Sequence, residues 1–312
     1  MKKSRLLLAI AAFLFAIQSH SQEAQKYMLP PEAIVRIVDA PQTPSVSVSP
    51  DRLNILLIER PGLITIKELS QEELRIAGLR IDPAVSGPSR QTYNTGFSLI
   101  SIDGSNPRKI EGLPSVPRMG FPVWSIDGKK FAFTNRTDNS FELWVCDIQT
   151  LKARLIANGV NLVFGGSVSW LPDNKSLVFL SVDPSRGVMP VRSTVPTGPV
   201  VQQNLGTRGQ AATYQDLLKD PVDEALFEYF ASSRVMLWNG STVSAIGKAG
   251  MITDVTPSPD GNYLLVTSVS KPFSYIVPYN SFPTLTSVWS ISGQTVKVLL
   301  QEPLIENQPR GY

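Results

Sequence analysis

The sequence has almost no histidine and almost no cysteine, with one of each among 312 residues. A single cysteine, Cys146, cannot form a disulfide within the chain, and metal sites built from Cys and His are excluded. Cys146 ends the apolar stretch Leu143-Trp-Val-Cys146, so we interpret it as a small buried side chain, with a reactive or intermolecular thiol as the alternative. No Asp-rich loop of calcium-binding spacing and no Gly-rich phosphate loop occurs either. We therefore expect no metal and no cofactor.

The one histidine, His20, lies in an N-terminal segment typical of an export signal. Three basic residues precede an apolar run from Leu6 to Ile17, and Ser19-His20-Ser21 fits a signal-peptidase site. The run is too short for a comfortable membrane span. We predict that residues 1–21 are a signal peptide and that the mature protein is exported by a bacterium, periplasmic or secreted, with no membrane span after cleavage.

Loss of this segment removes three basic residues and the histidine, which leaves 26 basic against 26 acidic side chains. A balanced charge argues against a nucleic-acid partner. Serine hydrolysis needs a base, usually histidine, and commonly a G-x-S-x-G turn around the serine. The nearest string, Gly165-Gly-Ser-Val-Ser169, lacks the closing glycine. We identify no catalytic residue and expect the chain alone to be inactive.

A short apolar strand, a polar turn built on an aspartate and a second apolar strand recur four times. The turn aspartates are Asp51, Asp127, Asp173 and Asp260, separated by 76, 46 and 87 residues. Blades of β-propellers show this recurrence, at about 45 residues per blade. We predict an all-β fold, a β-propeller of about four four-stranded blades that is part of a seven- or eight-bladed ring, with short helices in insertions.

The repeats also suggest a domain organisation after the signal peptide. An N-terminal extension is expected at 22–41, and the tail 302–312 is either the start of the next blade or a truncated end. The blades are expected at about 42–112, 119–158, 163–248 and 250–301.

Three insertions separate the second and third strands of their blades: Ile64 to Asn94, Asp183 to Ser232 and Ser270 to Thr284. In an up-and-down blade this connection lies at the end opposite the first turn, so the insertions should share one face, away from the four Asp turns. Binding residues collect on loops carried by a rigid scaffold. We predict that this face is the functional surface.

Two of the insertions have helical patterns. Ser70 followed by Glu73 fits a capping box, and Tyr214 to Phe230 indicates two short helices interrupted at Pro221. The second pattern contains Asp223, Glu224 and Glu228. These carboxylates are interpreted as a solvated helix face opposite Leu226, Phe227 and Phe230, and the alternative is that they hold the amino terminus of a peptide substrate.

Five segments carry a family resemblance that runs in order through essentially the whole mature chain. They are Tyr27 to Pro41, Leu74 to Ile81, Ser185-Arg-Gly187, Tyr214 to Asp220 and Tyr275-Ile-Val-Pro278. Together they resemble the N-terminal propeller of the prolyl oligopeptidase family of serine peptidases, and most closely its glutamyl endopeptidase branch.

The resemblance implies that a C-terminal α/β-hydrolase domain, missing from this chain, carries the Ser, Asp and His. The propeller would then cap that active site, gate access and contact a peptide substrate. Arg suits a glutamate carboxylate, and Arg186, Arg192 and Arg208 of the third-blade insertion are the candidate substrate-facing residues. The alternative is a stand-alone periplasmic propeller that binds proteins.

Overall fold

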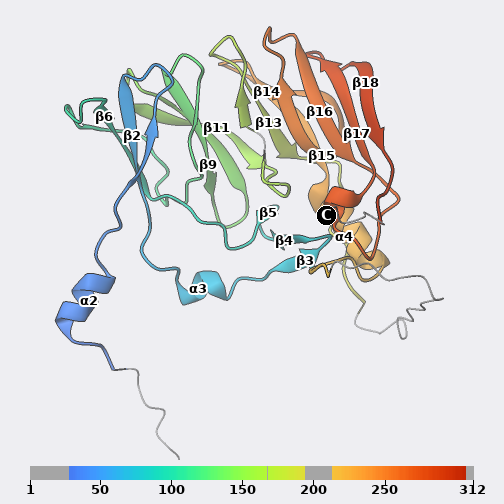
Figure 1. Cartoon of the computed structure of the whole chain (residues 1–312), viewed down its shortest axis with the longest axis horizontal. Coiled ribbons are helices and arrows are strands. Elements are labelled where there is room, and N and C mark those ends of the chain that lie inside the picture. Colours follow the sequence, from blue (N-terminus) through green and yellow to red (C-terminus); the bar gives the residue numbers. More distant parts are fainter. Residues whose placement is uncertain (1–27, 167, 194–212, 307–312) are drawn as a thin grey trace, which may run out of the picture. The chain divides into compact units, whose positions relative to one another are not determined.

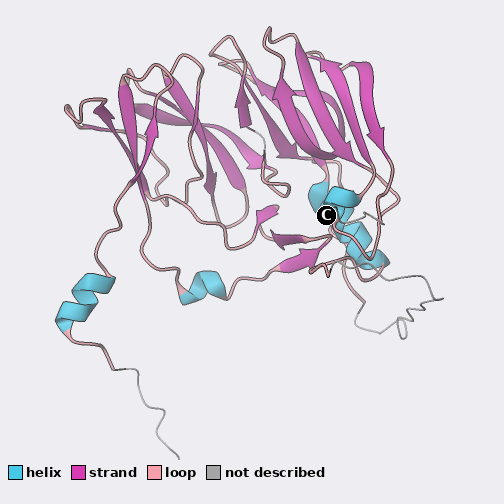
Figure 2. Ribbon diagram, in the orientation of Figure 1, coloured by secondary structure: helices cyan, strands magenta, loops and turns pink. Residues whose placement is uncertain are grey.

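The larger of two structural units in the computed structural model, which describes residues 28–166, 168–193 and 213–306, contains a 4-stranded, an 11-stranded and a 3-stranded antiparallel sheet (Figures 1 and 2). The 4-stranded and the 11-stranded sheets divide into four successive blades. The smaller unit is residues 1–41, and the larger is residues 42–312. Within the described part of the smaller unit, helix α2 (Glu32–Val38) buries none of its side chains.

The first sheet, or blade 1, pairs its strands in the order β1-β2-β6-β7. Its strands are β1 (Ser45–Val48), β2 (Asn54–Glu59), β6 (Gly96–Ser101) and β7 (Arg108–Lys109). Burial alternates along β2, where Leu56 and Ile58 are fully buried. Side chains of a strand alternate between the two sheet faces, so β2 turns one face to the interior. That face packs with Phe131 and Phe133 of the next sheet.

Blades 2, 3 and 4 follow in the same antiparallel pattern. The strands of blade 2 are β8 (Val123–Trp124), β9 (Lys130–Arg136), β10 (Phe141–Asp147) and β11 (Lys152–Val160). Blade 3 has β12 (Val168–Trp170), β13 (Leu177–Val182), β14 (Ser233–Trp238) and the first part of β15 (Val243–Pro257). Blade 4 has the second part of β15, then β16 (Tyr263–Val269), β17 (Thr284–Ser290) and β18 (Thr295–Glu302). The all-β propeller fold class is confirmed.

Strand β15 serves two blades because no loop separates them. Its residues up to Gly250 pair with β14, and pairing with β16 begins at Met251. A single pair, Val160 with Ser181, likewise joins β11 to β13. Backbone pairing between strands therefore continues from blade 2 into blade 3 and from blade 3 into blade 4.

The Asp turns follow a local hydrogen-bond pattern. The Asp173 carboxylate accepts the amides of Lys175 and Ser176, at 2.9 and 2.8 Å, and the hydroxyl of Ser176 at 2.7 Å. Neighbouring turns also touch, since the amide of Asp127 donates to Oδ1 of Asn174 at 2.9 Å. Asp side chains favour such turns because they satisfy nearby backbone amides.

The insertions lie at the other ends of the strands (Figure 1). The first contains α3 (Ile66–Leu69), β3 (Leu74–Ile76), β4 (Leu79–Asp82) and β5 (Gly87–Pro88); the third-blade insertion contains α4 (Pro221–Ala231) and the fourth-blade insertion η1 (Tyr279–Ser281). Antiparallel pairing requires the connection after the second strand to lie at the end opposite the connection after the first.

Two of the helix predictions are wrong. The capping box of α3 is formed by Thr65 and Glu68, and Ser70 ends that one-turn helix. Pro221 begins α4 instead of interrupting a longer helix, and the Asp220 side chain caps it by accepting the Asp223 amide at 2.9 Å. Proline has no amide proton. In a helix interior this removes a hydrogen bond, but in the first turn the amides have no partner within the helix, so nothing is lost there.

Candidate functional site

The three insertions contact one another and build a common structure. The Gly78 amide of the first insertion donates to the Asp216 carbonyl of the third-blade insertion at 2.8 Å. The Tyr279 amide of the fourth-blade insertion donates to the Ala77 carbonyl of the first insertion at 2.9 Å. Arg80 adds an ion pair with Asp216 at 2.7 Å. The expectation that the insertions share one face is confirmed.

An apolar cluster, which we call the insertion core, lies among these segments. Phe227 of α4 is fully buried and meets the rings of Phe164, Phe273 and Phe282 edge-on, with centroids 6.1, 5.2 and 5.7 Å away. The buried members of the core are Ile76, Ala77, Ile81, Val163, Leu218, Leu226, Phe227, Phe230, Ala231, Val269, Val277 and Phe282. Long loops are ordered when their own side chains pack, and here they pack on one another.

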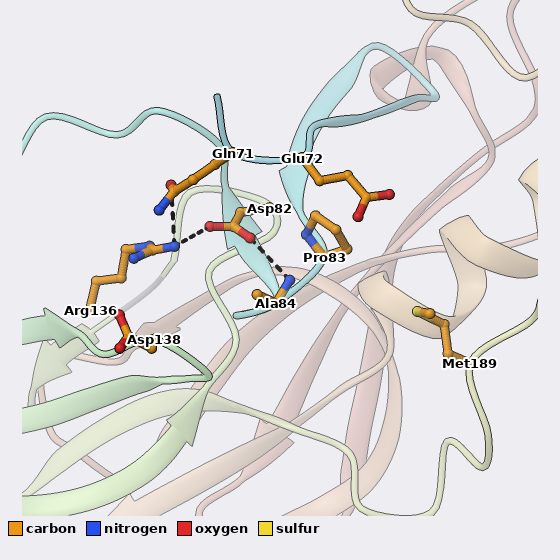
Figure 3. A pocket seen from close by; sticks show the side chains of 8 residues that line it. All are labelled: Gln71, Glu72, Asp82, Pro83, Ala84, Arg136, Asp138 and Met189. Atoms are coloured by element: carbon orange, nitrogen blue, oxygen red, sulfur yellow. Dashed lines mark hydrogen bonds and ion pairs between the residues drawn. The ribbon is translucent and has the colours of Figure 1, made fainter. Parts of the chain in front are cut away.

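A pocket of about 360 Å³ opens beside the first insertion (Figure 3). It is bounded by the first insertion, the end of β9 with the residues after it, and Met189 of the third-blade insertion. The lining residues are Gln71, Glu72, Asp82, Pro83, Ala84, Arg136, Asp138 and Met189. We call this the Arg136 pocket, because Arg136 is the cation among its lining residues.

Arg136 is held in place by two partners from the first insertion. Its Nη2 donates to the Asp82 carboxylate and, at 3.4 Å, to Oε1 of Gln71 (Figure 3). The side chains of Arg136 and Asp82 are 14% and 6% exposed. Asp82 in turn accepts the Ala84 amide at 3.0 Å through its other oxygen. Because both partners of the ion pair are fixed, the guanidinium keeps one orientation at the pocket wall.

Of the three arginines predicted to face a substrate, Arg186 is engaged inside the insertions. Its guanidinium carbon lies 4.0 Å from the ring centroid of Tyr229, and its Nη1 donates to the Ser86 hydroxyl at 3.0 Å. Burial lowers the pKa of Arg186, although Tyr229 opposes this. The side chain therefore ties the first insertion to α4.

Arg192 is paired with two carboxylates, and Arg208 lies outside the described residues. The Nη1 of Arg192 donates to Asp220 at 2.6 Å, and its Nη2 donates to Asp223. The hydrogen bond with Asp220 is the main cause that raises the pKa of Arg192. Neither described arginine lines the Arg136 pocket, whereas Arg136, which the sequence reasoning missed, does.

The interpretation of the α4 carboxylates as a solvated face is wrong for Asp223. Its side chain is 1% exposed and accepts the Lys219 amide at 2.9 Å as well as Arg192. Burial raises the pKa of the Asp223 carboxyl, while the Lys219 amide and Arg192 favour its ionised form. Glu228 pairs with Lys271 at 2.8 Å, and Glu224 accepts the Tyr275 hydroxyl.

Cys146 is fully buried in the core between blades 1 and 2, as expected for a small apolar side chain. Burial raises the pKa of its thiol to about 12. Among the described residues, no group of three or more Asp, Glu, Cys or His side chains is arranged to hold a metal ion. Within those same ranges, no helix is long and apolar enough to cross a bilayer.

Two plant proteins, each named probable glutamyl endopeptidase, chloroplastic, are similar to the chain. The protein of Arabidopsis thaliana is 39% identical over 298 residues and that of Oryza sativa subsp. japonica 36% identical over 299 residues. Each alignment covers 91% of this chain but only 31% or 32% of the relative. The chain thus spans about a third of the length of these relatives. No family model matches it.

Solved structures with similar folds are more distant in sequence. A prolyl endopeptidase structure is 13% identical in sequence and has a TM-score of 0.47. The match covers 95% of this chain and 35% of the prolyl endopeptidase chain. The acylaminoacyl peptidase of Pyrococcus horikoshii is 12% identical with a TM-score of 0.45, covering 85% and 33%. The fold assignment itself comes from the strand pairing of this chain, and kinship comes from the sequence relatives. Over nearly all of its length, the chain is thus similar to a portion of proteins named glutamyl endopeptidase, in agreement with the resemblance of its five segments to the propeller of that group.

Proposed function

We propose that this chain is the non-catalytic propeller portion of an exported serine endopeptidase, and that it gates the access of peptides to an α/β-hydrolase domain carried elsewhere in the protein. The observation that carries the proposal is the extent of the sequence match, which spans 91% of this chain and about a third of proteins named glutamyl endopeptidase. The remaining two thirds of such a protein leave room for further blades and for a catalytic domain.

The outer blades support the existence of further blades. On β1, Val46 and Val48 are 60% and 48% exposed, and on β18, Val298 and Leu300 are 48% and 51% exposed. Apolar strands left uncovered at a sheet edge invite association with other chains. Additional blades of a seven- or eight-bladed ring would cover them in the way that blade 2 covers blade 1.

The insertion end of the blades is the surface that we assign to the hydrolase domain. There, the insertions are joined by hydrogen bonds and by the insertion core, so they form an ordered surface that could limit the size of an entering substrate. The signal-peptide pattern of residues 1–21 supports export. The two plant relatives are named chloroplastic, a different destination that also lies outside the cytosol.

The test begins with the gene beyond codon 312. A reading frame that continues into a G-x-S-x-G motif supports the proposal, whereas a stop codon there favours the alternative, a stand-alone periplasmic propeller that binds proteins. If the frame continues, the full protein and its hydrolase domain alone are compared on a short peptide and on an unfolded protein carrying the same cleavage site. We expect the full protein to prefer the short peptide and the isolated domain to lose that preference. Equal size preferences in the two would contradict gating.

A further inference from the structure

The Arg136 pocket combines an oriented donor with unused hydrogen-bonding capacity. Arg136 uses Nη2 for Asp82 and Gln71, and its Nε and Nη1 make no hydrogen bond within the described residues. These two atoms are not closed off from solvent, because the buried side-chain nitrogens without a partner in that part of the chain belong to Arg108 and Arg234. Arginine carries five N–H donors in a rigid fork. Donors therefore remain available for a ligand after the guanidinium has been fixed.

The charges around the pocket decide which acceptor suits these donors. The positive charge of Arg136 is balanced by Asp82, with which it forms an ion pair. Asp138 is paired with Arg118 at 3.3 Å, and Glu72 is exposed with no ion pair among the described residues. The pocket wall thus has no excess of positive charge. A carboxylate on a ligand would be repelled by Glu72 and Asp138, whereas a neutral carbonyl oxygen on a ligand would not.

The rest of the lining is apolar or small. Pro83 and Ala84 follow Asp82 directly, and Met189, which is 42% exposed, stands across the pocket from Arg136 (Figure 3). Methionine adapts its shape to irregular apolar surfaces. A peptide could thus place a small side chain against Pro83 and Met189 while one of its carbonyls faces Arg136.

We propose that the Arg136 pocket binds the main chain of a peptide, with Arg136 donating to a backbone carbonyl oxygen and with Asp82 and Gln71 as positioning residues. The proposal rests on the proposed function only in taking a peptide as the ligand. It also implies that a preference for glutamate, if the whole enzyme has one, does not arise in this pocket.

The experiment uses the chain after removal of the predicted signal peptide, labelled with nitrogen-15. Three acetylated and amidated pentapeptides are titrated by NMR, each with four alanines around a central Gln, Glu or Lys. We expect the Gln peptide to shift the amide resonances of Asp82, Ala84 and residues 136–138, and the Glu peptide to bind no more tightly. Arg136→Gln should weaken binding of the Gln peptide by about tenfold or more, as expected for loss of a hydrogen bond to a charged donor.

Two further variants keep the outcome decisive. Arg136→Gln leaves the buried Asp82 without its cation, so the double variant Arg136→Gln with Asp82→Asn removes both charges and should fold while also binding at least about tenfold more weakly. Arg75→Gln, which removes a half-exposed arginine paired with Glu73 of the same insertion, is the matched control and should bind like the unmodified chain.

Three results would overturn the proposal: no resonance shift with any peptide, unchanged binding by the folded double variant, or at least tenfold tighter binding of the Glu peptide. None of these readouts depends on hydrolysis or on a second domain. Failure of the proposed function would instead be seen in the gene beyond codon 312 and in the size preference of the full protein, so the two failures are distinguishable.

Discussion

Replacing Phe227 by alanine should remove the centre of the insertion core. The Phe227 side chain is fully buried and contributes to three edge-on aromatic pairs with rings from two other segments. A buried Phe→Ala change typically lowers the free energy of unfolding by about 3–5 kcal/mol, because apolar contacts are lost and a cavity remains. Edge-on ring pairs contribute about 0.5–1.5 kcal/mol each beyond their buried area. We therefore expect about 4 kcal/mol or more for Phe227→Ala.

The assay is urea unfolding followed by tryptophan fluorescence, with hydrogen exchange of α4 as a local probe. Phe227→Leu keeps most of the apolar volume but none of the three ring pairs, so its cost should be smaller, about 1.5–3 kcal/mol. Phe121→Ala is the matched control: its side chain is 62% exposed, and surface changes stay within about 0.5 kcal/mol.

The reasoning would be refuted if Phe227→Ala cost less than about 1.5 kcal/mol by both probes, since a loss that small is outside the range for a well-packed core site. Equal costs for the alanine and leucine variants would also refute it, because the ring pairs and the cavity would then make no difference. A loss confined to exchange in α4, with unchanged fluorescence, would place the effect in the insertion core and leave the blades intact.

Three further predictions concern single residues. Asp173→Ala should cost about 1–2 kcal/mol of unfolding free energy at pH 7 through lost turn hydrogen bonds. Burial would raise the pKa of the Asp173 carboxyl, but its hydrogen bonds with Ser176 and Lys175 outweigh burial and lower that pKa. The ionised carboxylate therefore stabilises the fold above its unfolded pKa, and this stabilisation is lost as the pH falls through the folded pKa. Urea unfolding at pH 7 and pH 3 measures this, and a penalty that grows toward pH 3 would contradict it. Cys146, whose thiol pKa is raised to about 12, should not react with a thiol reagent at pH 8 until the chain is unfolded, and rapid labelling of the native chain would argue against its burial. Gly78→Ala should lower the thermal unfolding midpoint more than Gly104→Ala. Both glycines have positive φ, at 80° and 83°, but of the two only Gly78 would bring an added Cβ against another atom, the Pro278 Cβ at 2.5 Å. Equal losses of thermal stability would mean that this contact does not matter.

The propeller could be predicted from the sequence because its signals are short-range. A strand shows its buried face in the alternation of Leu56 and Ile58 with their neighbours, and a turn aspartate such as Asp173 bonds to amides only two and three residues away. The position of each insertion followed from counting strands within a repeat. Such features depend on neighbours in the chain, so their physical causes are visible in a single sequence.

The site depended on contacts that bring distant segments together. Arg136 and Asp82 are 54 residues apart, and nothing in either local sequence identifies them as partners. Asp223 was placed in solvent because it lies on the polar side of a helical pattern, yet Arg192 from a preceding loop covers it. An ion pair can be buried only when the fold supplies both charges at one place, which makes it a property of the tertiary structure. The sequence alone thus determined the blades and the end at which the insertions gather, while the packing of those insertions decided which arginine stands at a pocket.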